Sequence, residues 1–231
     1  MENNIEEKKE KSFSSILKKL ASRWFIDAFS GMAQGLFCTL IAGTILSLIA
    51  KWIGDNAVGN SLETIASFAK TLMGAGIGVG IANALKRGKL VMFSAAVAGF
   101  VGAFSDKIIA LDAALKLGTC GNPIGAYVVA LFTIEIVSLY AGKTKLDILI
   151  VPLGTLFLSY AGCFLAYPFI FLIGKLGVLI SEATKITPFF MGIIIAVVVG
   201  VVLTLPISSA ALCAMIGITG IAGGAAAVGC C

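Results

Sequence analysis

The feature that most constrains this chain is a series of apolar runs, several about 20 residues long, separated by short polar turns. A helix of about 20 apolar residues crosses the hydrocarbon core of a bilayer. The chain is 59% hydrophobic and 13% charged, whereas soluble domains are about half apolar and a quarter charged. The sequence therefore predicts an all-α, polytopic membrane helical bundle in contact with the lipid bilayer.

We expect about six to seven apolar segments, whose approximate ranges are 25–50, 61–85, 90–104, 123–142, 148–174, 189–205 and 207–231. The stretch 105–122 is too polar to cross, so we expect it in the interface or as a re-entrant element. Pro152 and Pro168 predict a kink or break in the fifth segment, and Pro206 ends the sixth. The bundle is thus expected to contain broken or re-entrant helices.

Residues 1–24 are highly charged and are predicted to form a separate cytoplasmic tail with an interfacial amphipathic helix, followed by a transmembrane domain over 25–231. A solvated charged tail is the alternative. With the N terminus inside, 11 of the 17 Lys and Arg residues lie inside and six outside. This bias predicts a multi-pass protein whose N terminus is inside.

Several classes of chemistry are excluded by composition. The chain has no His, so it can form neither a phosphohistidine nor a Ser-His or Cys-His catalytic pair. Its six cysteines form no CxxC motif, and most lie in apolar segments, so no zinc site is expected. The positive charge lies at the ends of apolar runs and forms no continuous basic face, so nucleic-acid binding is not expected. We expect no catalytic residue, metal or cofactor.

The glycines at 74, 76, 78 and 80 lie in the second apolar segment. A phosphate-binding loop would need a preceding strand and a Lys-Ser/Thr pair, and the sequence lacks both. Small residues at this spacing are typical of membrane helices that pack closely. Close helix packing is therefore the favoured interpretation.

Three groups of polar residues are candidates for a solute site. Glu135 lies within an apolar span, where a carboxylate is costly and either lines a functional cavity or bonds a neighbouring helix. Asn122 and Pro123 begin the same span, and Asn122 is expected to cap a helix whose free amides could bind a polar group, or merely to form a turn. Ser208 and Ser209 follow Pro206 and line either a helix break at a cavity or an ordinary kink.

Two blocks, "NPIGAYVVALFTIEIVSLYAGKTKLDILIVPLGTL" (122–156) and "TPFFMGIIIAVVVGVVLTLPISSAALCAMIGITGIAGGAAAVGCC" (187–231), resemble a known membrane family. They are similar to the second family of enzyme IIC (EIIC) sugar permeases of the bacterial phosphotransferase system. The resemblance covers roughly residues 15–231. It implies a bacterial cytoplasmic-membrane protein, a homodimer, and separate IIA and IIB subunits. It also implies that the chain continues past "VGCC", so that the domain is incomplete here.

Two functions follow from the pattern and the resemblance. The first is a permease that binds and moves a small polar solute, such as a sugar, with Glu135, Asn122, Pro123, Ser208 and Ser209 in the site. The second is a ligand-sensing membrane regulator that does not transport, as some relatives are described. An enzyme is a third option, and no nucleophile–base pair supports it.

Overall fold

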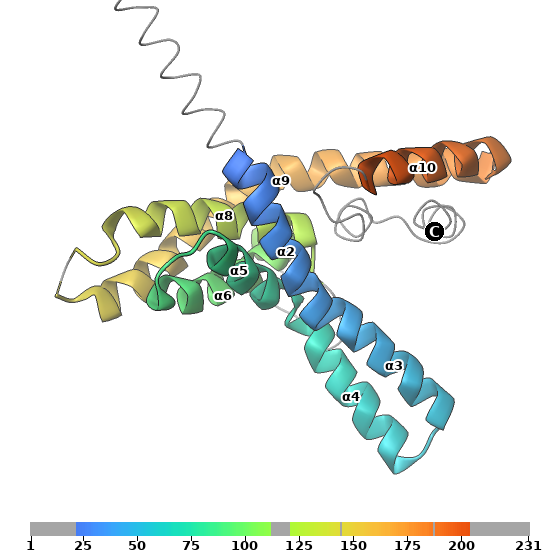
Figure 1. The fold of residues 1–231 in the computed structure, drawn as a ribbon, viewed down its shortest axis with the longest axis horizontal. Coiled ribbons are helices and arrows are strands. Elements are labelled where there is room, and N and C mark those ends of the chain that lie inside the picture. Colours follow the sequence, from blue (N-terminus) through green and yellow to red (C-terminus); the bar gives the residue numbers. More distant parts are fainter. Residues whose placement is uncertain (1–21, 112–120, 144, 187, 204–231) are drawn as a thin grey trace, which may run out of the picture.

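The computed structural model describes residues 22–111, 121–143, 145–186 and 188–203. This part of the chain is helical and contains no strand (Figure 1). Its elements are η1 (Arg23–Ala28), α2 (Phe29–Leu36), η2 (Phe37–Ile41), α3 (Ala42–Ile53), α4 (Ala57–Thr71), α5 (Met73–Ala84), α6 (Lys89–Ala103), α7 (Ser105–Ile109), α8 (Pro123–Tyr140), α9 (Asp147–Ile186) and α10 (Pro188–Leu203). The predicted all-α class is confirmed.

The first four elements form one continuous apolar helix from Arg23 to Ile53. Within it, η1 and η2 are π-helical, a form that is rare in helices and frequent at functional sites. This helix contains the predicted 25–50 span. Its second half, α3, pairs with α4 as a helical hairpin that projects from the rest of the bundle (Figure 1).

The second predicted span is a broken helix. Helices α4 and α5 meet at Leu72 with a bend of 50°. Just before the bend, the Thr71 hydroxyl donates to the carbonyl of Ser67 at 2.8 Å, and such back-bonding tends to bend helices. The break therefore comes at a position that carries neither proline nor glycine.

Helix α5 lies between α2 and α6 at the centre of the bundle (Figure 1). One of its faces presents Gly76 and Gly80 to Gly31 and Gly35 of α2, so two GxxxG patterns meet. A Cβ added at any of these four positions would overlap an atom of the facing helix, in most cases a backbone carbonyl. The backbones themselves are in contact, which confirms the predicted close packing.

The opposite face of α5 packs against α6 in the same way. Gly74 lies against Gly99, and Gly78 lies against the Ala95 carbonyl. Large apolar side chains fill the space above and below these contacts, and among them Ile77 and Ile81 of α5 are fully buried. Helix α5 is consequently fixed on two sides by contacts that leave no room for a larger residue.

Helices α8 and α9 cover the far side of α6. Helix α9 continues through Pro152 and Pro168, so neither proline breaks the helix, and it runs on into the predicted connector 175–188. Towards its C-terminal end, α9 extends beyond the bundle together with α10 (Figure 1). Of the predicted amphipathic stretch 105–122, α7 and a turn are described, while 112–120 lie outside the described residues.

Among the described residues, three helices are long and apolar enough to span a membrane: Arg23–Ile53, Pro123–Tyr140 and Asp147–Lys175. The bent α4–α5 pair brings this number to four, and α6 is apolar but shorter. The membrane class is thus supported, while the predicted number of six to seven segments is not confirmed. The segments 1–21 and 204–231, which include Ser208 and Ser209, lie outside the described residues.

Candidate functional site

Glu135 lies in the C-terminal third of α8 and is the centre of a polar cluster. Its Oε2 atom is 2.7 Å from Nη2 of Arg87, and its Oε1 atom is 3.1 Å from Nη2 of Arg23. The indole Nε1 of Trp24 also donates to Oε1 at 3.3 Å. One carboxylate thus joins α8 to the start of the first helix and to the α5–α6 loop.

Arg87 is positioned by the C-terminal cap of α5. Lys86 takes a left-handed conformation with φ of 53°, and its amide donates to the Asn83 carbonyl at 2.9 Å. The Arg87 amide donates to the Ala82 carbonyl at 3.0 Å, which completes a Schellman cap. The cap turns the chain sharply, and the Arg87 side chain then reaches Glu135.

Trp24 is positioned by α8 itself. The Tyr127 hydroxyl donates to the Trp24 carbonyl at 2.7 Å, and the Tyr127 ring packs against Phe29 with centroids 4.9 Å apart. These contacts fix the crossing of the first helix over α8. The contacts of Tyr127 with the first helix therefore hold Arg23 and Trp24 within reach of Glu135.

The cluster combines charge, a ring and partial access to solvent. Two guanidinium groups share one carboxylate, so positive charge is in excess, and the buried Nε of Arg87 has no hydrogen-bond partner within the described residues. Trp24 is 37% exposed, and the Glu135 side chain is 23% exposed. Carboxylate, guanidinium and indole groups together can bind hydroxyls, an apolar sugar face and an anionic group.

Asn122 and Pro123 form the N-terminal end of α8. The Asn122 Oδ1 atom accepts from the Ile124 amide at 3.0 Å, so the predicted cap is confirmed, and Pro123 occupies the first helical turn. The backbone N–H of Asn122 donates to the Ala103 carbonyl at 2.7 Å, which connects the N-terminal end of α8 to α6. Nearby, the buried Ser105 hydroxyl has no partner within the described residues.

The structure does not bring Asn122 and Glu135 together. They lie on the same helix, and its rise of 1.5 Å per residue separates them by roughly 20 Å. Each belongs to a different end of α8. A single site that uses both side chains directly on one small solute is therefore not supported by this conformation.

The family model described as "Phosphotransferase system, EIIC" matches residues 26–231. The chain belongs to this EIIC family. Neither the curated proteins nor the solved structures that were compared with the chain gave a match. As an EIIC protein, the chain is a membrane-embedded, permease-type transport component, of the kind that works with IIA and IIB components and a sugar substrate.

The residues of this EIIC chain that sequence reasoning missed are the partners of Glu135. The sequence pattern indicates only a basic topology signal at Arg87, and it places Arg23 and Trp24 in the tail. The available signal was the rule that a carboxylate in a membrane span needs a partner. The rule alone does not name the partner. Within the described residues, no group of three His, Cys, Asp or Glu side chains could hold a metal ion.

Proposed function

We propose that the chain binds and translocates a sugar, with the Glu135 cluster as part of the solute pathway. The observation that carries this proposal is the partly exposed cluster of carboxylate, guanidinium and indole groups on an EIIC scaffold. Carboxylate and guanidinium groups match sugar hydroxyls, and the partly exposed indole of Trp24 would offer a stacking surface.

The proposed orientation has the N terminus inside a bacterial cytoplasmic membrane. Arg23 adjoins the basic tail, and Arg87 belongs to the basic loop 86–89. Glu135 lies about one turn and a half before the end of α8, which leads to the basic turn 143–145. Two basic segments thus reach the cluster, and a third follows the end of the helix that carries Glu135, which supports a cytoplasmic position for the cluster.

The excess positive charge at this end suits the chemistry of a phosphotransferase system. A sugar that receives a phosphoryl group from a separate IIB chain becomes an anion at the cytoplasmic side. The two guanidinium groups of Arg23 and Arg87 would hold that phosphate through charge-assisted hydrogen bonds. In this proposal Glu135 holds both cations until the sugar phosphate competes for them.

The remaining candidate residues are proposed to line other parts of the pathway. Asn122 and Pro123 would border its opposite end, because they lie at the far end of α8. Ser208 and Ser209, which do not belong to the described residues, would complete the lining of the pathway. Homodimerisation and separate IIA and IIB subunits belong to the same proposal.

Uptake into proteoliposomes tests this function. The full chain is reconstituted with IIA and IIB proteins, phosphoenolpyruvate, HPr and enzyme I, and a panel of radiolabelled hexoses and amino sugars is offered outside. We expect uptake of one sugar in the native protein and a loss of at least tenfold in Glu135→Gln, which cannot bind two cations. The matched control is Ser138→Ala on the same helix, because the Ser138 hydroxyl donates to the backbone carbonyl of Glu135 and not to its carboxylate.

Each outcome has a distinct meaning. Equal uptake in the native protein and in Glu135→Gln contradicts the role given to this cluster. Saturable binding of a sugar without uptake by the native protein contradicts transport and favours the ligand-sensing regulator. Neither binding nor uptake of any sugar in the panel contradicts the proposed sugar transport.

A further inference from the structure

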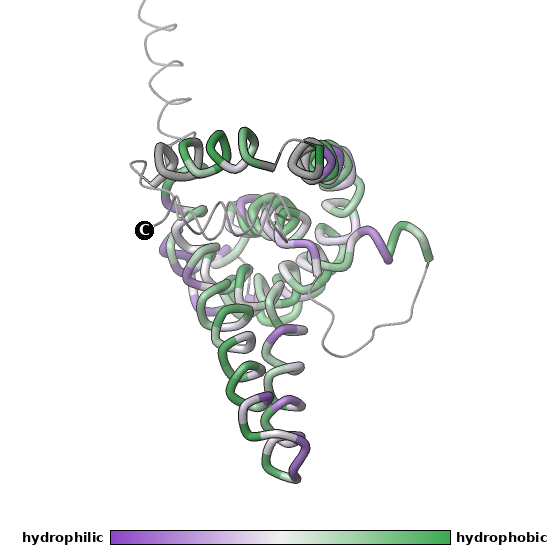
Figure 2. Tube along the Cα trace, turned by 90° about the vertical axis from the view of Figure 1, so that its right-hand side faces the viewer, coloured by the Kyte–Doolittle hydropathy of each residue, from purple (hydrophilic) through white to green (hydrophobic). Residues whose placement is uncertain are grey.

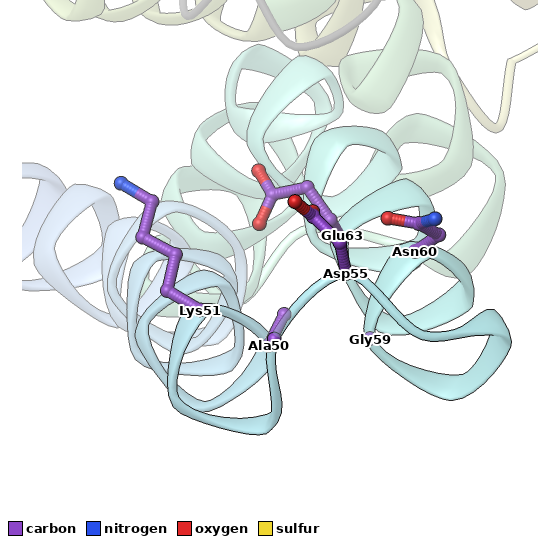
Figure 3. Close-up of a pocket in the computed structure, with 7 residues that line it drawn as sticks. Ala50, Lys51, Asp55, Gly59, Asn60 and Glu63 are labelled. Carbon is purple, nitrogen blue, oxygen red and sulfur yellow. The ribbon is translucent and has the colours of Figure 1, made fainter.

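A second polar site lies far from Glu135, at the tip of the α3–α4 hairpin. A solvent-exposed groove of about 380 Å³ lies between the end of α3 and the start of α4, large enough for a small molecule. We call it the hairpin groove (Figure 3). Its lining residues are Ala50, Lys51, Gly54, Asp55, Gly59, Asn60 and Glu63. Figure 2 shows hydrophilic segments at the tip of this mainly apolar hairpin.

Small residues keep the hairpin groove open. Gly54 ends α3 with φ of 84°, a conformation that a larger residue rarely adopts. A Cβ added at Gly59 would overlap the Gly54 carbonyl. The turn therefore needs glycine at both positions. With Ala50 beside them, no long side chain fills the space between the helix ends.

The Glu63 carboxylate is held in place on the inner wall. The Ser47 hydroxyl, which is only 6% exposed, donates to its Oε2 at 2.6 Å. Lys70 Nζ lies 3.5 Å from its Oε1. A carboxylate oxygen accepts more than one hydrogen bond, so both oxygens keep capacity for a ligand. The carboxylate is thus oriented before any ligand arrives.

The other polar groups flank this carboxylate and are free to bind. In Figure 3 the carboxylates of Asp55 and Glu63 lie between Lys51 and Asn60. Within the described residues, no hydrogen bond is made by the side chains of Lys51, Asp55 and Asn60. Lys51 lies in the last turn of α3 and Asn60 in the first turn of α4, while Asp55 lies in the turn between them. The groove therefore offers an amide, an ammonium group and two carboxylates at one opening.

The mixture of groups decides the class of ligand. Hydroxyls both donate and accept, so they match a wall that alternates carboxylate acceptors with ammonium and amide donors. A metal ion is disfavoured by the Lys51 ammonium, and an anion by the two carboxylates. We infer that the hairpin groove binds a neutral monosaccharide as a first docking site, separate from the Glu135 cluster. This inference rests on the proposed transport function for its choice of a sugar.

The proposed orientation places the hairpin groove on the outer side, because the turn 54–56 follows the first span. A sugar would then meet it before reaching the bundle. No aromatic ring lines the groove, so we expect weak binding, with a Kd in the millimolar range. Weak binding suits a docking site from which the solute must leave.

Two tryptophans allow the two sites to be measured separately, since the chain contains only Trp24 and Trp52. Trp52 does not line the groove, but it directly follows the lining residue Lys51 and is 85% exposed, so Trp24→Phe leaves a single tryptophan next to the groove. Trp52→Phe leaves a reporter at the Glu135 cluster. Fluorescence of each full-length variant in nanodiscs is titrated with glucose, mannose, galactose and N-acetylglucosamine up to about 20 mM, a range that covers millimolar Kd values.

We expect one of these sugars to change Trp52 fluorescence saturably in Trp24→Phe. Adding Asn60→Ala or Glu63→Gln to that protein should weaken binding by at least fivefold. The matched control is Ser61→Ala, because the Ser61 hydroxyl bonds the Ala57 carbonyl of its own helix and does not line the groove.

No response to any sugar, or equal Kd values in all three additional variants, would overturn the hairpin groove as a sugar site. Neither result affects the proposed function, which uptake and the Trp24 reporter test independently. Conversely, a groove response that is lost in Asn60→Ala supports the groove even where the native protein shows no uptake.

Discussion

Replacing Gly74 of α5 with alanine places a methyl group where the contact with α6 has no room. The added Cβ lies 2.5 Å from the Gly99 carbonyl oxygen and 2.6 Å from the Ala103 Cβ. Favourable contacts between such atoms begin at about 3.5 Å, so the two helices must separate by roughly 1 Å. Because the first obstacle is backbone, no side-chain rotation can relieve it.

The expected cost follows from two opposing effects. Overpacking costs about 1–3 kcal/mol, while replacing a helical glycine with alanine recovers about 0.5–1 kcal/mol of backbone entropy. We therefore expect Gly74→Ala to lower the free energy of unfolding by up to about 2.5 kcal/mol. For a chain of this size, each 1 kcal/mol lowers the Tm by roughly 2–4 °C.

Thermal unfolding of the purified full chain in detergent, followed by circular dichroism, measures the change. The control is Gly174→Ala in α9, because an added Cβ there meets no atom within 4 Å. That variant should gain stability from the entropy effect alone. A Tm for Gly74→Ala that equals or exceeds the Tm of Gly174→Ala would refute the close α5–α6 packing.

Three further predictions test local features of the fold and the cluster. Asn122→Ala removes the cap of α8 and should destabilise the chain by about 0.5–2 kcal/mol, with Asn122→Asp restoring the Tm. Lys86→Gly relieves a left-handed residue and should raise the free energy of unfolding by about 1 kcal/mol; an unchanged or lower Tm would contradict the strained cap. Arg87→Ala and Glu135→Gln should be coupled by roughly 0.5–3 kcal/mol in a double-mutant cycle, and additive effects would argue against the ion pair.

The helices, the glycine contacts and the α8 cap could be predicted, because each depends on local sequence. Apolar runs mark helices, small residues at fixed spacing mark close packing, and Asn122 before Pro123 marks a helix start. The bend at Leu72 could not be predicted, because it follows Thr71, whose hydroxyl bonds the Ser67 carbonyl, and not a proline or glycine. Conversely, Pro152 and Pro168 predicted a disruption, yet α9 continues through both.

The partners of Glu135 also lay beyond sequence reasoning. Arg87 is 48 residues away and Trp24 is 111 residues away along the chain. Only the crossing of the first helix over α8 and the cap at Lys86 bring them together. A carboxylate in an apolar span indicates that some partner exists, whereas its identity depends on the tertiary packing.

The glycine contacts and the Glu135 cluster depend on each other. Arg87 directly follows the cap of α5, and Arg23 begins the helix that contains α2, so any sliding of α5 along α2 would pull one arginine away from Glu135. Backbone contact on both faces of α5 opposes such sliding, since carbonyl groups cannot change rotamer as side chains can. Helices α2, α5, α6 and α8 are therefore expected to move as one body.

The α3–α4 hairpin differs, because it joins this body through two irregular points, the π-helical η2 and the bend at Leu72. Any change that carries a solute from the hairpin groove towards Glu135 is then expected to bend the chain at these two points rather than within the glycine-packed body.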